Sequence, residues 1–225
     1  MHRKTVFTDP TSVEAARALV AACCDGLDGV VNFAGILAVG SVIEMEIETL
    51  RRALDVNVIG TAHVNRALFP LVLARKGRIV NSSSETGWQS GMPFNGAYAM
   101  SKHAIEAYSD SLRRELMFLD VSVIKIQPGP FRTEMVAGID RSFTHATEAS
   151  TYFKGMLTRL KHMAANEQAK AHDPALVAEV VHTALTTRHP SAAYSVKPDP
   201  QRAALNLLPT RAADALLKLV LGWSS

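Results

Sequence analysis

Length, composition and charge restrict this chain to a few classes of protein. Its 225 residues are 48% hydrophobic and 20% charged, with a formal net charge of +3 and a pI near 9.0, which fits one globular domain with a sizeable core. The positive charges are scattered and form no dense basic block, so we expect no nucleic-acid groove.

The cysteines, histidines and apolar segments indicate a soluble, cytoplasmic protein. Cys23 and Cys24 are adjacent, which does not suit a disulfide framework and favours a reducing compartment. The first ten residues lack the apolar core of a signal peptide. No apolar run approaches about 18 residues, so we expect no membrane span. No Cys-x-x-Cys or His-x-x-x-His spacing occurs, so no metal site is expected.

The first elements are predicted to be a strand, a helix and a second strand. Residues 4–8 suit a short strand. Asp9 suits a helix N-cap with Pro10 at the first helical position, and helical character continues to Cys24. Residues 29–33 read as a buried strand that leads into a turn of small residues.

A long helix is predicted for residues 47–75. Leu50, Leu54 and Val58 recur at helical spacing and form an apolar stripe. Asn57 lies inside that stripe, where an amide is unfavourable unless it is hydrogen-bonded. We therefore expect Asn57 to have a functional role in preference to a purely structural one.

Residues 78–102 combine side chains that are suited to proton transfer. Residues 78–81 read as a short buried strand, and three serines, 82–84, follow where it should end. A helix then carries Tyr98 and Lys102, four residues apart and so on one face. A phenol has a pKa near about 10, which a nearby ammonium lowers, and a serine hydroxyl can hold a carbonyl or alcohol oxygen. Each feature alone is ordinary, but their combination in this order is specific.

Helix and strand continue to alternate in the second half of the sequence. The predicted elements are the Tyr98 helix to residue 118, a strand at 121–126, a helix at 174–187 and a strand at 192–196. The tail, residues 200–223, is apolar and suits a pair of amphipathic helices that close the domain or form an oligomer contact. Membrane-surface association ranks lower, because the tail has no dense basic face.

These pieces resemble the short-chain dehydrogenase/reductase family, whose signature is a strand-end Ser followed by Tyr-x-x-x-Lys. Further pieces stand in the family's order, and together they cover about residues 5–135: Asn32-Phe33-Ala34-Gly35, Asn57-Val58-Ile59-Gly60, and Pro128-Gly129 with Thr133. The resemblance implies an α/β fold with a Rossmann-like, doubly wound parallel sheet in three layers. Residues 1–225 would form one such domain, with 134–172 as a substrate lid.

The resemblance also implies a role for each catalytic residue. Tyr98 would be the general acid/base, and Lys102 would lower its pKa and bind the nicotinamide ribose. Ser84 would orient the substrate oxygen and is a better candidate than Ser83. Asn57 would hold a water molecule beside Lys102 and kink its helix.

The cofactor implied by the resemblance is NAD or NADP. Its expected contacts, besides Tyr98 and Lys102, are Asn32, Ala34, Gly35, Pro128, Gly129 and Thr133. Phe33 stands where the family has a second Asn. This replacement either loosens one polar contact, or Phe33 simply packs in the core.

The family pattern begins with a strand, a Gly-x-x-x-Gly-x-Gly turn, a helix and a second strand, whereas no Gly occurs here before Gly26. About 30 residues of the pattern are unmatched, including two central strands of the family's 3-2-1-4-5-6-7 sheet. Three explanations compete: a start assigned too late, a real truncated product, or direct pairing of strand 4–8 with strand 29–33. We favour the first, because the catalytic set is complete.

The resemblance implies an NAD(P)-dependent oxidoreductase that interconverts a secondary alcohol and a carbonyl. Residues 92–95 and 113–116 look most like members that act on steroids or retinoids, and the apolar 134–172 region also favours a lipophilic substrate. The alternative is a catalytically silent fragment or partner subunit that cannot bind the cofactor. A homodimer or homotetramer formed through helices 47–75 and 97–118 is expected.

Overall fold

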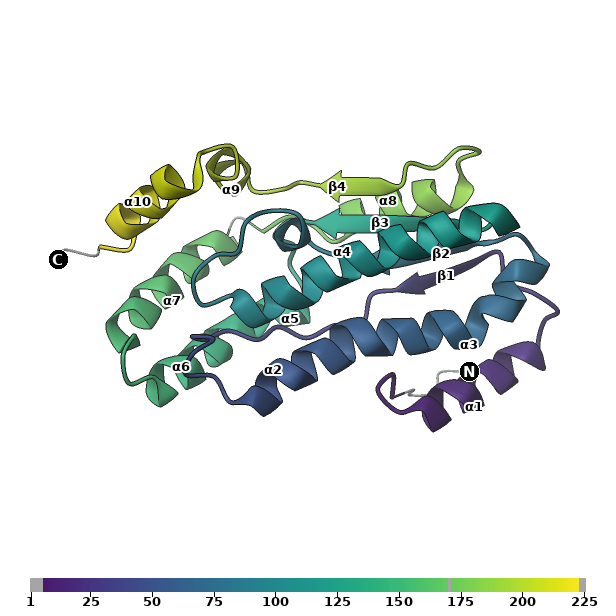
Figure 1. The fold of residues 1–225 in the computed structure, drawn as a ribbon, viewed down its shortest axis with the longest axis horizontal. Coiled ribbons are helices and arrows are strands. Elements are labelled where there is room, and N and C mark those ends of the chain that lie inside the picture. Colours follow the sequence, from purple (N-terminus) through teal and green to yellow (C-terminus); the bar gives the residue numbers. More distant parts are fainter. Residues whose placement is uncertain (1–5, 170, 223–225) are drawn as a thin grey trace.

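A parallel sheet with helices on both faces forms the centre of the molecule (Figure 1). The computed structural model describes residues 6–169 and 171–222. Within these residues, one sheet contains four parallel strands in the order β1-β2-β3-β4. The strands are β1 (Gly29–Asn32), β2 (Arg78–Ser82), β3 (Ser122–Pro128) and β4 (Ala193–Val196). The predicted α/β class and parallel sheet are confirmed.

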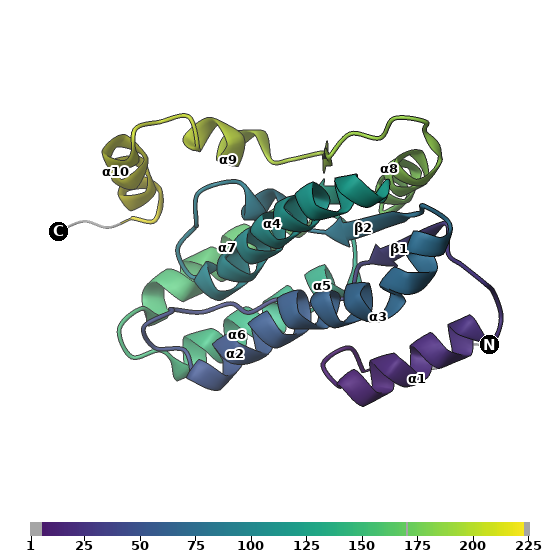
Figure 2. The ribbon, with the colours of Figure 1, turned by 45° about the vertical axis from the view of Figure 1, so that its right-hand side comes forward.

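Ten α-helices occur among the described residues, and three of them pack on the faces of the sheet. The ten are α1 (Pro10–Ala21), α2 (Ile47–Leu54), α3 (Gly60–Ala74), α4 (Gly96–Leu116), α5 (Glu134–Ala137), α6 (Ile139–Ala149), α7 (Lys154–Ala169), α8 (Ala175–Thr186), α9 (Pro200–Leu205) and α10 (Thr210–Val220). Helices α3 and α4 cover one face of the sheet and α8 covers the other, while α1 lies outside α3 (Figures 1 and 2).

Alternating side chains along the strands create two apolar cores. Ile79 of β2 and Val123 of β3 pack toward α3 and α4, together with Val72. Val80 and Ile124, their neighbours in sequence, point to the other face and pack with α8. This alternation is the period of a β-strand that is buried on both sides. It produces the predicted three-layer arrangement.

The carboxyl ends of the strands lie along one edge of the sheet. All four arrows point toward the side that holds α5 and α9 (Figure 1). Asn32 pairs with Asn81, and Ser82 with Ile126, so the ends of the first three strands are close to level. In an open parallel sheet, ligands bind at this edge. The loops after β1, β2 and β3 therefore come together in space.

The long predicted helix is interrupted by a π-helical turn. Residues Asp55–Ile59 form this turn between α2 and α3, and the Thr61 hydroxyl donates to the Asn57 carbonyl oxygen over 3.2 Å. A π turn inserts an extra residue and is frequent at functional sites. The kink expected at Asn57 takes this form.

The predicted strand at residues 4–8 is wrong where the chain is described. Val6 to Thr8 form coil and a turn, and Lys4 and Thr5 lie outside the described residues. The Val6 N–H donates to the Ser12 hydroxyl over 3.0 Å, and the Asp9 N–H donates to the Val6 carbonyl over 3.0 Å. These bonds tie the segment to the first turn of α1 and not to β1. Among the described residues β1 pairs with β2 alone, which contradicts direct pairing of 4–8 with β1.

By length and composition alone, one described helix could cross a membrane, Ile47–Ala74. The sequence analysis expected no segment that could span a membrane, and this helix is long and apolar enough to be an exception. Its α3 part packs on the sheet through Val64, Leu68 and Val72. It also buries the polar side chains of Asn57 and Asn65, and 28% of its most apolar 18-residue window is buried.

A buried amide network joins β1 and β2 to α3 and α4. Asn32 Nδ2 donates to Asn65 Oδ1 over 2.7 Å and to Asn81 Oδ1 over 3.0 Å. Asn65 Nδ2 donates to Tyr108 Oη over 3.3 Å, and Asn81 Nδ2 to Ser109 Oγ over 3.0 Å. Buried polar groups need such partners. The network fixes the carboxyl ends of β1 and β2 against the helices.

Replacing Asn81 with Ala should destabilise the fold by about 2–3 kcal/mol, because Asn32, Asn65 and Ser109 each lose a buried partner. Urea unfolding followed by circular dichroism measures the loss. Ser109→Ala, which removes one bond of the network, is the matched control and should cost about 1 kcal/mol. Equal stability of Asn81→Ala and the wild type would show that the network contributes nothing.

Candidate active site

A cavity of about 960 Å³ opens at the carboxyl edge of the sheet. Its walls come from the loops after β1, β2 and β3 and from helices α4, α5 and α8. It includes most of the residues predicted from the sequence: Ala34, Gly35, Ser84, Tyr98, Lys102, Pro128, Gly129 and Thr133. Segments that are far apart in the sequence thus meet at one site.

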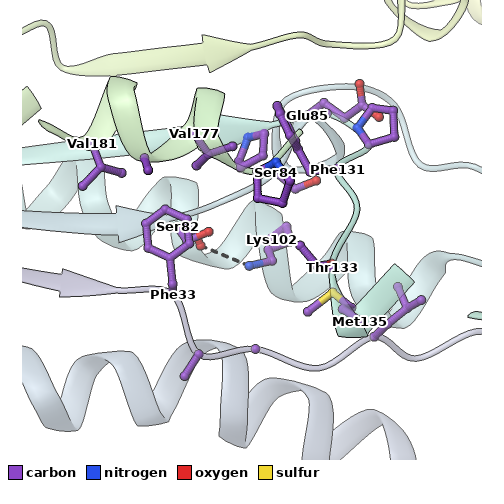
Figure 3. Close-up of a pocket in the computed structure, with 18 of the residues that line it drawn as sticks. Phe33, Ser82, Ser84, Glu85, Lys102, Phe131, Thr133, Met135, Val177 and Val181 are labelled. Carbon is purple, nitrogen blue, oxygen red and sulfur yellow. Dashed lines mark hydrogen bonds between the residues drawn. The ribbon is translucent and has the colours of Figure 1, made fainter. Parts of the chain in front are cut away.

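Lys102 lies at the centre of this cavity (Figure 3). Its Nζ donates to the Ser82 carbonyl oxygen over 3.0 Å and lies 5.6 Å from the centre of the Tyr98 ring. The residue is 4% exposed. Burial lowers the pKa of Lys102 to about 8, and the smaller effect of the Glu106 charge opposes this. The ammonium therefore loses its proton much more readily than one in water.

Ser84 acts on the pKa of the Tyr98 phenol, whereas Lys102 Nζ lies over the Tyr98 ring. Burial raises the pKa of Tyr98 above its usual value, and a side-chain hydrogen bond with Ser84 opposes this without cancelling it. The prediction that Lys102 lowers this pKa is wrong for the structure as it stands. The ammonium is bonded to the Ser82 carbonyl, so desolvation decides the direction of the shift.

The structure distinguishes Ser84 from Ser83. Ser84 lines the cavity, and its Oγ accepts from the Thr86 N–H over 3.2 Å at the start of a 3-10 turn, Glu85–Gly87. Ser83 does not line it, and its hydroxyl packs against Gly87, where a Cβ would lie 2.5 Å from Ser83 Oγ. The preference for Ser84 as the residue beside the substrate agrees with this geometry.

Asn57 holds the loop after β1 and does not itself line the cavity. Its Oδ1 accepts from the Ile36 N–H over 2.7 Å, and its Nδ2 donates to the Ile36 carbonyl and to Ser101 Oγ, both over 2.9 Å. A Cβ placed on Gly35 would lie 3.2 Å from Asn57 Oδ1 and 3.8 Å from Lys102 Nζ. Asn57 is therefore close to the ammonium, but its amide is already engaged. Its role in holding a water molecule stays a prediction.

The Asn32 side chain is turned away from the cavity. Its amide belongs to the buried network with Asn65 and Asn81, so the prediction that it lines the cofactor cleft is wrong for the side chain. Phe33, the next residue, lines the cavity instead and is 42% exposed. The interpretation that Phe33 packs in the core is also wrong, because successive residues at a strand end face opposite sides.

The sequence reasoning missed the Glu85 carboxylate and the α8 wall. Glu85 lines the cavity beside Ser84 although it is only 6% exposed. Val177 and Val181 of α8 face the same space as Phe33 (Figure 3). An acidic residue directly after a candidate catalytic serine was a visible signal for Glu85. The α8 side chains carried no signal of their own, since their spacing only predicts a buried helix face.

Comparing the pH dependence of stability of the wild type and Lys102→Met tests the lowered pKa of Lys102. With a folded pKa of about 8 against 10.5, the folded chain releases this proton between these values while the unfolded chain keeps it. Stability relative to Lys102→Met should therefore rise with pH, by on the order of 3 kcal/mol over the full window.

Urea unfolding at several pH values from about 7 to about 9.5 measures this difference. Lys218→Met, on the exposed face of α10, controls for the loss of a lysine as such. A difference between the wild type and Lys102→Met that does not change with pH would contradict the burial effect on this ammonium.

Comparisons with known proteins agree with this geometry. A family model described as short chain dehydrogenase matches residues 2–142. Retinol dehydrogenase 16 of Rattus norvegicus is 36% identical over 203 residues, which are 85% of this chain and 63% of that protein. The 17-beta-hydroxysteroid dehydrogenase type 6 of Bos taurus is 37% identical over 235 residues, covering 95% of this chain and 72% of that protein.

A solved structure shares the fold. A short-chain dehydrogenase from Streptomyces avermitilis superposes with a TM-score of 0.72 at 24% identity, covering 98% of this chain and 77% of that one. The chain spans 63–65% of the length of the first three curated relatives that it matches, all retinol dehydrogenases. With the family model matching more than half of its residues, the chain belongs to the short-chain dehydrogenase family.

Proposed function

We propose that this chain acts as an NAD(P)-dependent oxidoreductase that interconverts a secondary alcohol and a carbonyl. One arrangement supports this most directly: the Tyr98 phenol, Ser84 and the buried Lys102 ammonium line one cavity, with Lys102 Nζ 5.6 Å from the centre of the Tyr98 ring. The family to which the chain belongs uses NAD or NADP.

Ser84, Tyr98 and Lys102 have separate roles in proton transfer. The Ser84 Oγ holds the substrate oxygen, and Tyr98 donates its proton to that oxygen when a carbonyl is reduced. The raised pKa of Tyr98 keeps the phenol protonated at neutral pH, as a proton donor must be. In the oxidative direction Tyr98 must accept a proton, and a Lys102 cation acting directly on the phenolate would favour that state.

The residues around Lys102 fit the nicotinamide end of the cofactor. NAD or NADP, when bound, supplies or accepts the hydride at the carbinol carbon. The ammonium of Lys102 has three donors, of which Ser82 takes one, so donors remain for hydroxyl acceptors in the cavity. The missing side chain of Gly35 leaves space next to Lys102 Nζ. Residues 1–225 contain no Gly-x-x-x-Gly-x-Gly turn, so no pyrophosphate cradle of that type is among them.

Apolar walls favour a lipophilic substrate. Phe33, Phe131, Met135 and Val177 line the cavity, and such a lining selects apolar ligands while a few polar groups fix their orientation. The names of the two curated relatives, a retinol and a hydroxysteroid dehydrogenase, agree with this choice.

The predicted lid, residues 134–172, forms α5, α6 and α7. It is held to the rest of the molecule by an edge-to-face pair of Phe94 and Phe153, with ring centres 5.4 Å apart. Glu44 also accepts hydrogen bonds from Ser150 Oγ over 2.7 Å and from the Tyr152 N–H over 2.8 Å. Two contacts thus anchor the turn before α7, and we assign the lid function to this segment.

A single domain that works as a homodimer or homotetramer in the cytoplasm is part of the same proposal. Exposed apolar side chains lie on the helices expected at the interface, with Ile59 in the π turn, Met100 on α4 and Phe118 just after α4. Such residues suit a contact between copies.

Tyr98→Phe should reduce kcat by about 10²–10⁴-fold with a 17β-hydroxysteroid as substrate, because the proton donor is removed. The rate of NAD(P)H absorbance change measures the loss. Tyr194→Phe removes a phenol that accepts from the Ser191 N–H over 3.0 Å and does not line the cavity, so it should keep wild-type turnover. Retained turnover in Tyr98→Phe would remove Tyr98 from the reaction.

Titration of the purified chain with NADH and with NADPH, followed by isothermal calorimetry, separates an enzyme from a silent partner subunit. Micromolar binding that weakens in Lys102→Met supports the enzyme, because that ammonium is the charged donor in the cavity. No binding at millimolar cofactor supports a catalytically silent fragment. The observation that favours this alternative is that residues 1–225 contain no Gly-x-x-x-Gly-x-Gly turn.

A further inference from the structure

The Glu85 carboxylate lies beside Ser84 and is held by a segment more than a hundred residues later. Its Oε2 accepts from the Asp199 N–H over 2.6 Å, and its Oε1 accepts from Arg202 Nη1 over 3.2 Å. The Glu85 side chain is 8% exposed and that of Arg202 21%. A buried carboxylate without such partners would be strongly unfavourable, so the pair holds α9 onto the loop after β2.

The same guanidinium is linked to the catalytic hydroxyl through one residue. Arg202 Nη1 also donates to Thr86 Oγ1 over 3.3 Å, and the Thr86 N–H donates to Ser84 Oγ over 3.2 Å. Ser84 in turn lies close enough to Tyr98 to lower the pKa of its phenol. A continuous chain of contacts therefore runs from α9 through Thr86 to the two hydroxyls that would meet the substrate.

We propose that Glu85 and Arg202 are positioning residues for this reaction: their ion pair docks α9 on the 3-10 turn and holds Ser84 against Tyr98. The inference rests on the proposed function, and it assigns the C-terminal segment a part in assembling the site. Neither side chain needs to touch the substrate oxygen for this role.

The charges of the pair also act on the phenol, in opposite directions. Glu85 raises the pKa of Tyr98 and Arg202 lowers it, after the larger effects of burial and of the Ser84 bond. The charged or titratable groups that face Tyr98 are Glu85 on the 3-10 turn, Arg202 on α9 and Lys102 on α4. The two charges of the ion pair therefore have opposing effects on the pKa of Tyr98, and loss of either partner leaves the effect of the other unopposed.

A second tie between the same segments provides a matched control. The Ser90 N–H and Ser90 Oγ both donate to Asn206 Oδ1, over 2.9 and 2.8 Å. This tie also joins the loop after β2 to the end of α9, but it is exposed and bonds neither Ser84 nor Tyr98. Ser90→Ala removes the hydroxyl bond and keeps the N–H bond, so it weakens the docking of α9 without changing the charges around the phenol.

Ionisation of Tyr98, followed by the ultraviolet absorbance of the phenolate in the purified chain, tests the proposal without requiring turnover. Subtracting the titration of Tyr98→Phe removes the other tyrosines of the four in the chain, and far-ultraviolet circular dichroism confirms that each variant stays folded. Arg202→Met should raise the Tyr98 midpoint and Glu85→Gln should lower it, whereas Ser90→Ala should leave it unchanged. Glu85→Gln keeps the side-chain shape, so the test survives if Arg202→Met does not fold.

Turnover gives a second, independent reading. Arg202→Lys keeps the charge but removes the Nη1 atom that donates to both Glu85 and Thr86. It should keep the Tyr98 midpoint and lower kcat by on the order of 10²-fold with little change in KM, because Ser84 is misplaced. The pH profile of kcat/KM should move with the Tyr98 midpoint in Glu85→Gln.

The outcomes separate this proposal from the proposed function. Opposite shifts of the Tyr98 midpoint in Glu85→Gln and Arg202→Met support the positioning role, even if the wild-type chain shows no turnover and the oxidoreductase assignment fails. Midpoints that move no more than in Ser90→Ala would overturn the positioning role, even if turnover is high. In that case the ion pair would only attach α9.

Discussion

One hydrogen bond, from Lys102 Nζ to the Ser82 carbonyl oxygen, determines the geometry of the whole site. It joins the middle of the layer formed by α4 to the last residue of β2. Tyr98 precedes Lys102 by one helical turn, so fixing the lysine also directs the phenol toward Ser84, just past the end of the strand. Burying the ammonium is costly, and its lowered pKa records this cost. This cost arises where Lys102, Tyr98 and Ser84 come together in one cavity.

The sequence was sufficient to predict most of the fold. The predicted bounds of β2, α4 and the π-interrupted helix differ from the observed ones by a residue or two, because apolar periodicity and turn residues are local signals. The N-cap at Asp9 is confirmed by its bond to the Thr11 N–H. The strand predicted at residues 4–8 failed, because its β-branched residues suit a strand but nothing described pairs with them.

The site was predictable as a set of residues but not in its electrostatics. Ser84, Tyr98 and Lys102 share a cavity as expected. The direction of the Tyr98 pKa shift depends on desolvation and on which acceptor the ammonium finds, and spacing along a helix contains neither. Asn32 could not be placed because its partners, Asn65 and Asn81, follow it by 33 and 49 residues. For Glu85, the partner Arg202 lies 117 residues later.

The π turn at Asp55–Ile59 changes the relative directions of the Asn57 and Asn65 side chains. In an uninterrupted α-helix, Asn57 and Asn65 would point about 80° apart, because eight residues advance each by about 100°. The part of the widened turn that follows Asn57 removes some of that rotation and brings the two amides closer to one face of the helix. One helix can then hold the loop after β1 through Asn57 and join β1 to β2 through Asn65.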